Sequence, residues 1–270
     1  MAKQFEDKVV IVTGSSSGIG QDAAVEFGKE GALLVIHGQN PERLNETETL
    51  LLDVGVPQNN ILKVLGSMED PKTPSVIVEK TVEKFGRIDV LINNAGASSK
   101  LGCTNQHDLE NIDFLFKVNL RSVIELTQRA LPYLKQTKGN VINVSSASAK
   151  VVYPQAIFYG SIKACLDQFT RNYALLYGRR GVRINSINPG FVRTLIFQRN
   201  GVPNSQEVVE LQALKSSLRR IGLPNEVSPV LKYLASDAAA HITGANFAID
   251  GGITNYSPLL DLDEAMMLSI

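Results

Sequence analysis

The stretch Lys8–Gly20, with the sequence KVVIVTGSSSGIG, decides the fold of this chain. Its first half is a β-branched apolar run, typical of a buried strand. Its second half is a Gly/Ser loop that leads into a helical segment from Gln21. Glycines permit a tight turn and a close backbone approach to a ligand, and a helix N-terminus offers unpaired N–H donors with partial positive charge. The stretch therefore indicates a site for the pyrophosphate of a dinucleotide.

The spacing of the glycines leaves an alternative open. It reads G-x-x-x-G-x-G over Gly14–Gly20, whereas the usual dinucleotide fingerprint is G-x-G-x-x-G. A P-loop is excluded because no Gly-Lys-Ser/Thr follows. A strand-to-helix turn without a ligand remains the alternative, but the position directly after the first strand favours a cofactor loop.

Outward from this stretch, short apolar runs alternate with longer segments of helical period. Nearly continuous apolar runs are typical of parallel strands covered on both faces, and the first six runs are far enough apart for helical crossovers. With no repeat and no linker composition, the chain is predicted to form an α/β fold: a three-layer, doubly wound (Rossmann) parallel sheet of about seven strands, in a single domain over residues 1–270. The predicted strands are Lys8–Thr13, Ala32–His37, Ile61–Leu65, Ile88–Asn93, Asn140–Ser145, Val182–Ile187 and Asn246–Ile249.

Composition and charge exclude several classes of protein. The chain has 270 residues, 44% of them apolar, and its 27 basic and 27 acidic residues give a formal net charge of zero. A nucleic-acid binder usually needs a basic excess, and a disordered chain has few apolar residues, so we expect neither. Two cysteines without a C-x-x-C pattern predict neither a disulfide framework nor a metal site. With no signal-peptide pattern and no apolar run of ~18 residues, we expect a cytoplasmic protein without a membrane partner.

One helix can be predicted from its period. Its apolar residues recur at helical spacing and predict one buried stripe, on which Cys165 is expected to be a packed core thiol. The stripe consists of Ile162, Cys165, Leu166, Phe169, Tyr173 and Leu176.

The end of the second predicted strand bears on the choice of cofactor. An NAD enzyme places Asp or Glu there to bind the ribose 2′-hydroxyl, but this position is Gly38. Without a carboxylate to repel it, a 2′-phosphate could be bound by Gln39, Asn40, Arg43 and Ser15, which favours NADP. The alternative is that Arg43 is a solvated residue of the next helix.

Tyr159 and Lys163 are four residues apart, so on a helix they share one face. A fixed cation beside a phenol lowers the phenol's pKa from ~10, which would suit Tyr159 to acid–base work. Ser146 follows the fifth predicted strand, and ligands in open α/β sheets bind beyond the carboxyl ends of strands. The alternative for Ser146 is a serine that caps a turn.

The ordered set of motifs resembles the short-chain dehydrogenase/reductase superfamily in its single-domain form. It comprises T-G-x-x-x-G-I-G at Thr13–Gly20, N-N-A-G at Asn93–Gly96, Asn119, Ser146, Y-x-x-x-K at Tyr159–Lys163, and Pro189-Gly190. Each motif alone is modest, but the ordered set is specific and covers nearly the whole chain. The resemblance implies an NAD(P)-dependent oxidoreductase that moves a hydride between the nicotinamide and a carbonyl or alcohol carbon.

The resemblance also implies residue roles. Tyr159 would be the proton donor and Lys163 its cationic neighbour; Ser146 would hold the substrate carbonyl, and Asn119 would anchor a water in a proton relay. The residues expected at the cofactor are Gly14, Ser15, Ser16, Ser17, Gly18, Ile19, Gly20, Gln39, Arg43, Ser67, Asn94, Ala95, Gly96, Tyr159, Lys163, Pro189, Gly190, Val192 and Thr194.

Two positions depart from the family pattern. The family commonly has an Asp after the third strand that contacts adenine, where this chain has Ser67 followed by Met68. The family's NADP enzymes place an Arg directly after the position of Gly38, where this chain has Gln39, so NAD stays possible.

The remaining segments predict features of the substrate site and of assembly. Residues 191–222 resemble the family's mobile lid and 253–270 form an apolar tail. The residues expected to surround a neutral, fairly apolar carbonyl or alcohol are Tyr153, Pro154, Ile157, Phe191, Leu195, Ile196, Phe197, Val208, Val209, Leu211 and Leu214. The resemblance implies a homotetramer or homodimer. The alternatives are a sugar-nucleotide epimerase or dehydratase, disfavoured by length and glycine spacing, and a non-catalytic dinucleotide-binding or scaffold protein.

Overall fold

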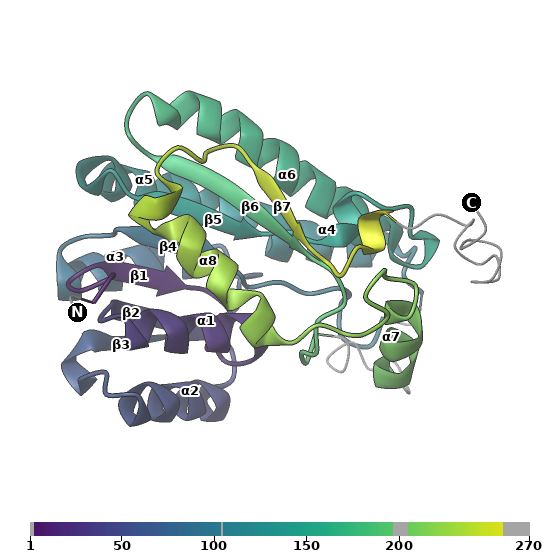
Figure 1. The fold of residues 1–270 in the computed structure, drawn as a ribbon, viewed down its shortest axis with the longest axis horizontal. Coiled ribbons are helices and arrows are strands. Elements are labelled where there is room, and N and C mark those ends of the chain that lie inside the picture. The colour runs from purple at the N-terminus through teal and green to yellow at the C-terminus, as the bar shows by residue number, and fades with distance from the viewer. Residues whose placement is uncertain (1–2, 104, 197–204, 256–270) are drawn as a thin grey trace, which may run out of the picture.

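The computed structural model describes residues 3–103, 105–196 and 205–255 (Figure 1). Its core is a seven-stranded sheet of order β3-β2-β1-β4-β5-β6-β7 in which neighbouring strands are parallel. The predicted fold class is confirmed, and each strand overlaps its predicted run. The strands are β1 (Val9–Val12), β2 (Leu33–Gly38), β3 (Ile61–Leu65), β4 (Val90–Asn93), β5 (Asn140–Val144), β6 (Arg183–Pro189) and β7 (Asn246–Ile249).

Helices cover both faces of the sheet. α1, α2 and α8 pack on one face, and α3, α5 and α6 pack on the other (Figure 1). α7 lies beyond the end of the sheet at which the strands finish. The helices are α1 (Gly18–Lys29), α2 (Pro41–Asp53), α3 (Thr73–Phe85), α4 (Leu109–Phe116), α5 (Ser122–Thr137), α6 (Ile157–Gly178), α7 (Ser205–Ala213) and α8 (Ser228–Ala235).

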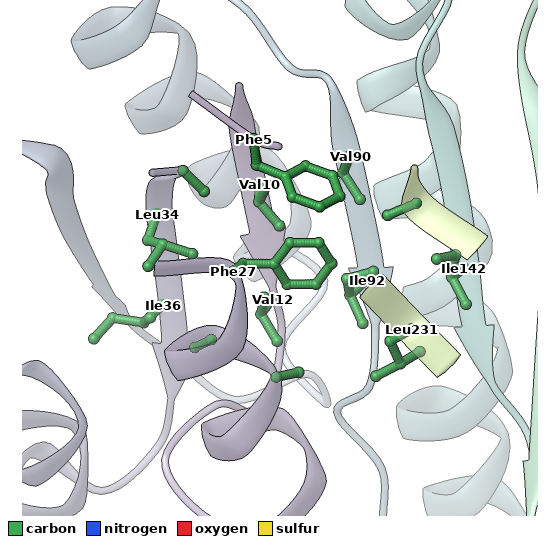
Figure 2. Close-up of a cluster of buried hydrophobic side chains, with 14 of the residues drawn as sticks. Phe5, Val10, Val12, Phe27, Leu34, Ile36, Val90, Ile92, Ile142 and Leu231 are labelled. Carbon is green, nitrogen blue, oxygen red and sulfur yellow. The ribbon is translucent and has the colours of Figure 1, made fainter. Parts of the chain in front are cut away.

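Side-chain alternation along β1 shows why its apolar run has no polar face. Val10 and Val12 point to the cluster that contains Phe27 of α1, whereas Val9 and Ile11 belong to the cluster on the opposite face. Figure 2 shows the first cluster, with Phe27 packed across β1 and against Phe5, whose ring centroid lies 4.8 Å away. Because side chains of a strand alternate, a strand buried on both faces must be apolar throughout.

Helix α6 differs from its prediction in one respect. Ile162 and Leu166 are buried and Phe169 is partly buried, as the stripe requires, but Cys165 is exposed and Leu176 is 57% exposed. The interpretation of Cys165 as a core thiol is therefore wrong. Polar residues occupy the buried face instead, since Lys163, Asp167 and Thr170 are all buried, and an apolar period could not reveal them.

The strand order places a crevice between β1 and β4. After β1 the chain crosses to β2 on one side, and the later strands are added on the other side, so the loops that follow β1 and β4 diverge at the carboxyl ends. The predicted lid also begins and ends at this edge. The Arg193 N–H donates to the Gly222 carbonyl (2.9 Å) and the Gly222 N–H donates to the Phe191 carbonyl (2.8 Å), so the two ends of the segment are joined.

Candidate active site

A large cavity lies at the carboxyl ends of the strands. Its volume of about 1390 Å³ exceeds the ~300–1,000 Å³ usual for a single small-ligand site, so it has room for two ligands side by side. Its described lining includes four basic residues and neither Asp nor Glu, although the chain as a whole has no net charge. The basic residues are Arg43, Lys150, Lys163 and Lys215. The cavity therefore favours an anionic ligand.

The glycine loop forms one wall of this cavity through close backbone packing. Gly14 has a φ of +65°, and a Cβ there would lie 2.7 Å from the Cα of Ala95. Asn94 fixes the loop to β4, because its Nδ2 donates to the carbonyls of Thr13 (2.8 Å) and Gly14 (3.1 Å). Helix α1 begins at Gly18, and no side-chain hydrogen bond caps its first turn, so its N-terminal N–H groups face the cavity as anion donors.

His37 joins the glycine loop to the strand beyond it. Its Nδ1 lies 3.3 Å from the Gly14 nitrogen and accepts that N–H, so its Nε2 carries the proton and donates to the Gly66 carbonyl (3.1 Å). Burial lowers the pKa of His37 to about 4, which keeps the ring neutral. Sequence reasoning missed this residue. The available signal was a polar side chain at the carboxyl end of an apolar strand.

The segment after β2 brings three polar side chains to the cavity. They are Gln39, Asn40 and Arg43. Asn40 is the N-cap of α2, and its Oδ1 accepts the backbone N–H of Arg43 (2.8 Å). Gly38 packs closely against Ser16, because a Cβ at this position would lie 2.8 Å from the Cβ of Ser16. No carboxylate stands at this corner of the described lining.

Three predicted cofactor residues do not reach the cavity. The hydroxyl of Ser15 is buried against the backbone of His37, whose N–H donates to it (2.9 Å), so Ser15 cannot donate to a 2′-phosphate. Gly20 packs behind the loop, against Gly14 and Asn94. Ser67 turns its hydroxyl to the Glu69 N–H (3.2 Å), and Met68 lines the cavity in its place.

The other predicted cofactor residues all line the cavity. They are Gly14, Ser16, Ser17, Gly18, Ile19, Gln39, Arg43, Asn94, Ala95, Gly96, Tyr159, Lys163, Pro189, Gly190, Val192 and Thr194.

Ser146 and Tyr159 meet at the centre of the cavity. Ser146 follows β5 and Tyr159 lies in the first turn of α6, and both line the cavity, where the Ser146 hydroxyl acts to lower the pKa of Tyr159. Ser146 also accepts the Ser148 N–H (3.1 Å), so it caps a turn as well as facing the cavity. Burial raises the pKa of Tyr159 to about 12, and the effect of Ser146 offsets only part of this rise. The predicted lowering of this pKa by Lys163 is therefore not found in the protein alone.

Lys163 stands behind Tyr159 on the same helix. Its Nζ lies 5.6 Å from the centre of the Tyr159 ring and donates to the Val144 carbonyl (2.8 Å). Only 3% of the residue is exposed, and burial lowers its pKa to about 8, with Asp167 acting in the opposite direction. The ammonium is thus held by a backbone carbonyl under the phenol, at the edge of the cavity.

Asn119 lies one layer behind the cavity. It sits in a π-helical turn, Lys117–Arg121, between α4 and α5, and such turns are frequent at functional sites. Its amide bonds both backbone groups of Ala97 and the Leu115 carbonyl. A Cβ on Gly96 would lie 2.8 Å from the Asn119 Oδ1 and 3.7 Å from the Lys163 Nζ, so these three residues converge.

The substrate side of the cavity is mainly apolar. Of the residues predicted there, Tyr153, Pro154, Phe191, Leu195 and Ile196 line it. Ile157 is 45% exposed and does not line it, because it lies on the outer face of the first turn of α6, and Leu211 and Leu214 are also exposed. Val209 is buried, and Phe197 and the Val208 side chain lie outside the described residues.

Comparison with known proteins gives the family. A family model described as enoyl-(acyl carrier protein) reductase matches residues 14–254. The 3-oxoacyl-(acyl-carrier-protein) reductase of Thermotoga maritima is 34% identical over 252 residues, covering 93% of this chain and 99% of the relative. The meso-2,3-butanediol dehydrogenase of Serratia marcescens is 34% identical over 251 residues, with 93% and 96% covered.

The chain belongs to the short-chain dehydrogenase/reductase family. A short-chain dehydrogenase/reductase of unknown function from Caenorhabditis elegans, solved with its cofactor, is 33% identical and superposes with a TM-score of 0.90. That match covers 96% of this chain and all of the other. The family's single sheet and its motifs thus extend along nearly the whole chain.

The geometry fits the NAD(P) cofactor that the short-chain dehydrogenase/reductase family implies. The cradle over Gly14, the N-terminus of α1 and the basic lining suit a pyrophosphate, and Tyr159 and Lys163 lie at the other end. No group of three or more His, Cys, Asp or Glu within the described ranges could hold a metal ion. No helix in the part of the chain that the structure describes is long and apolar enough to cross a membrane.

Proposed function

We propose that this short-chain dehydrogenase/reductase is an NAD(P)-dependent oxidoreductase that interconverts a carbonyl compound and a secondary alcohol, with Tyr159 as general acid and base. The observation that carries the proposal is that Ser146, Tyr159 and the buried Lys163, whose Nζ lies 5.6 Å from the centre of the Tyr159 ring, together line one cavity large enough for two ligands. The nicotinamide cofactor, when bound, supplies or accepts the hydride.

Each polar residue has a role in the proposed reduction. The Ser146 hydroxyl donates to the carbonyl oxygen and stabilises the negative charge that develops there. Tyr159 gives its proton to this oxygen as the hydride reaches the carbon. A phenol pKa near 12 keeps Tyr159 protonated at neutral pH, as a donor must be. The Lys163 ammonium stabilises the phenolate left behind, and Asn119 supports the relay that returns a proton to it.

The test is Tyr159→Phe, which removes one hydroxyl. Turnover is expected to fall by roughly 10²–10⁴-fold, the usual contribution of a positioned acid, while cofactor affinity, measured by fluorescence titration, stays the same. Tyr153→Phe is the matched control, because Tyr153 lines the same cavity and has no assigned role in proton transfer. Undiminished turnover by Y159F would falsify the assignment and favour a non-catalytic dinucleotide-binding protein or scaffold.

NADP is proposed as the favoured cofactor. Gly38 carries no carboxylate, and Gln39 and Arg43 line the cavity at the same corner. NAD is the second candidate, because Gln39 is not the Arg that would bind a 2′-phosphate most strongly. Titration with NADPH and NADH separates them: tighter binding of NADH would reverse the preference.

The proposed substrate is neutral and fairly apolar. Tyr153, Phe191 and Ile196 line its side of the cavity, and the Lys150 Nζ there donates to the Asn246 carbonyl (3.0 Å). Relatives named for 3-oxoacyl groups, butanediol and glucose support only the class of alcohols and carbonyls. A panel of ketones paired with their keto acids, followed at the nicotinamide absorbance, tests this; preference for the acids would contradict it.

The proposed assembly is a cytoplasmic homotetramer or homodimer of single-domain subunits, with a lid over residues 191–222 and a tail over 253–270. Leu175 and Leu176 support it, because they expose 80% and 57% of their surface on the outer face of α6, where an apolar patch favours a partner. Size-exclusion chromatography with light scattering measures the state. Leu176→Arg is expected to dissociate the assembly, and a monomeric wild type would contradict it.

A further inference from the structure

A buried carboxylate lies beneath the proposed catalytic residues and is not explained by their roles. Asp167 lies on α6, four residues after Lys163, and only 4% of it is exposed. Its oxygens accept hydrogen bonds from two neutral groups of β6, the Ser186 Oγ (3.3 Å) and the Asn188 Nδ2 (2.8 Å). A buried charge is costly unless it is well bonded, so this carboxylate needs an explanation.

Asn188 carries the contact from Asp167 to the centre of the cavity. Its Nδ2 donates both to Asp167 and to the backbone carbonyl of Ser146 (3.0 Å). An amide nitrogen has two protons, so one side chain serves both acceptors. Asn188 itself is fully buried and directly precedes Pro189 in the cavity wall. Asp167 therefore fixes the backbone position of Ser146 relative to α6.

The charge of Asp167 acts on Lys163. Burial lowers the pKa of Lys163, and the Asp167 carboxylate opposes this effect. The other described groups around the ammonium are neutral: the Val144 carbonyl, the phenol of Tyr159 and the amide of Asn119.

The next cation along α6 does not compensate Asp167. Arg171 lies one turn further on, and its guanidinium turns instead to Gln168 and Asn246. Among the described residues, Asp167 is thus the charged group that bears on Lys163.

We propose that Asp167 is a positioning residue for the reaction: its carboxylate holds Lys163 in the charged form and, through Asn188, holds Ser146 beside Tyr159. Its effect on turnover rests on the proposed function, whereas its effect on Lys163 does not. The cation matters because it stabilises the phenolate formed when Tyr159 gives up its proton. A neutral Lys163 would leave that phenolate unsupported in a buried site.

The decisive experiment reads Lys163 directly in the cofactor-free protein. Protein labelled with ¹³Cε-lysine is titrated by NMR, and the Lys163 resonance is assigned by its absence from K163M. In D167N, which keeps the size and loses the charge, the titration midpoint of Lys163 is expected to move to lower pH by about one unit. D167E, which keeps the charge, is expected to keep the Lys163 midpoint close to its wild-type value. An unchanged midpoint in D167N overturns the proposal.

A matched control separates charge from packing. Thr170 lies on the same buried face of α6 and accepts the Asn143 Nδ2 of β5 (2.9 Å), but it is uncharged. T170V is expected to lower stability while leaving the Lys163 midpoint unchanged; an equal shift in T170V would mean that packing alone sets it and would overturn the proposal. Should D167N not fold, D167S makes the same test with a smaller neutral side chain.

The kinetic consequence is a change in pH profile. With D167N, reduction is expected to fall about fivefold at pH 8 and little at pH 6, because lowering the pKa of Lys163 from about 8 by one unit lowers its protonated fraction at pH 8 from about one half to about one tenth. A uniform loss at both pH values would indicate a structural role and contradict the proposal. Failure of the proposed function would appear instead as undiminished activity of Y159F, with the Lys163 titration unaffected.

Discussion

The two halves of the cavity are built from different materials. The half around Gly14 and α1 is shaped mainly by backbone, namely closely packed glycines and the N–H groups of a helix. One neutral side chain, His37, accepts a backbone N–H of this loop. The half around Ser146 and Tyr159 is shaped by buried polar side chains that are themselves costly to fold. A binding surface needs shape and fixed dipoles, whereas proton transfer needs ionisable groups in a low-dielectric setting. The halves should therefore respond differently to substitution.

The largest effect is expected from Lys163→Met, in the side-chain half. Turnover should fall by about 10³-fold, yet the protein should become more stable near neutral pH. Burial lowers the pKa of Lys163 from 10.5 to about 8 in the folded protein, so its charge costs about 3 kcal/mol of folding free energy below pH 8. This cost fades as pH rises from 8 toward 10.5, so the advantage of K163M over wild type should disappear there.

Urea unfolding at pH 7 and pH 10.5 measures this difference. Lys232→Met is the matched control, since Lys232 bonds Glu26 and Glu30 on the surface, and these bonds outweigh burial and raise its pKa. That variant should lose stability at pH 7. A K163M protein less stable than wild type at pH 7 would show that the buried charge of Lys163 does not cost folding free energy, which contradicts the proposed difference between the two halves of the cavity.

The next effect is expected from Gly20→Ala, in the backbone half. A Cβ at Gly20 would lie 2.5 Å from the Gly14 carbonyl and 2.3 Å from the Asn94 amide nitrogen, so the loop must shift. We expect cofactor affinity to fall by at least about tenfold and stability by about 1–3 kcal/mol. Cofactor titration and thermal unfolding measure both.

Gly178→Ala is the matched control for the loop, because no neighbouring atom of the described residues lies within 4 Å of a Cβ at that position of α6. It should leave cofactor binding unchanged. Equal affinities for G20A and wild type would show that the close packing of the loop does not shape the site.

A smaller effect is expected from Arg43→Gln. Arg43 lines the cavity beside Gly38, and losing one charge-assisted bond to a 2′-phosphate should weaken NADPH about tenfold, with NADH nearly unchanged. Arg129→Gln, which removes a surface arginine paired with Glu125, is the control. Parallel titrations with both cofactors decide, and an equal loss for NADH would place Arg43 on the shared part of the dinucleotide.

The smallest effect is expected from Cys165→Ser, on the outer face of α6. Because Cys165 is exposed, the free energy of unfolding should change by less than about 0.5 kcal/mol. Chemical denaturation of the protein at low concentration measures it. In the monomeric protein, a loss well above 1 kcal/mol would mean that Cys165 is buried within the subunit.

Much of the fold was predictable from local pattern. Runs such as Val9–Val12 are apolar at every residue, which only a strand covered on both faces requires. The spacing of the glycines over Gly14–Gly20, directly after this run, predicted the cofactor loop. Tyr159 and Lys163 were predictable as neighbours because helical spacing brings residues four apart together. The interpretation of Cys165 failed because α6 faces a polar site and buries Lys163, Asp167 and Thr170. The spacing of apolar residues cannot show that polar residues occupy the buried face.

What the sequence determined by itself is the order of strands and loops and the identity of the groups at the strand ends, because both follow from contacts close in the chain. Only the tertiary structure decided which of those groups share the cavity. The hydroxyls of Ser15 and Ser67 bond to nearby backbone groups instead of facing the cavity, whereas His37 bonds the Gly66 carbonyl. Asp167, on the same helix as Lys163, is bonded by Asn188 of β6. The tertiary structure also reversed the expected direction for the pKa of Tyr159, because burial depends on every element around the phenol and not on the lysine four residues away.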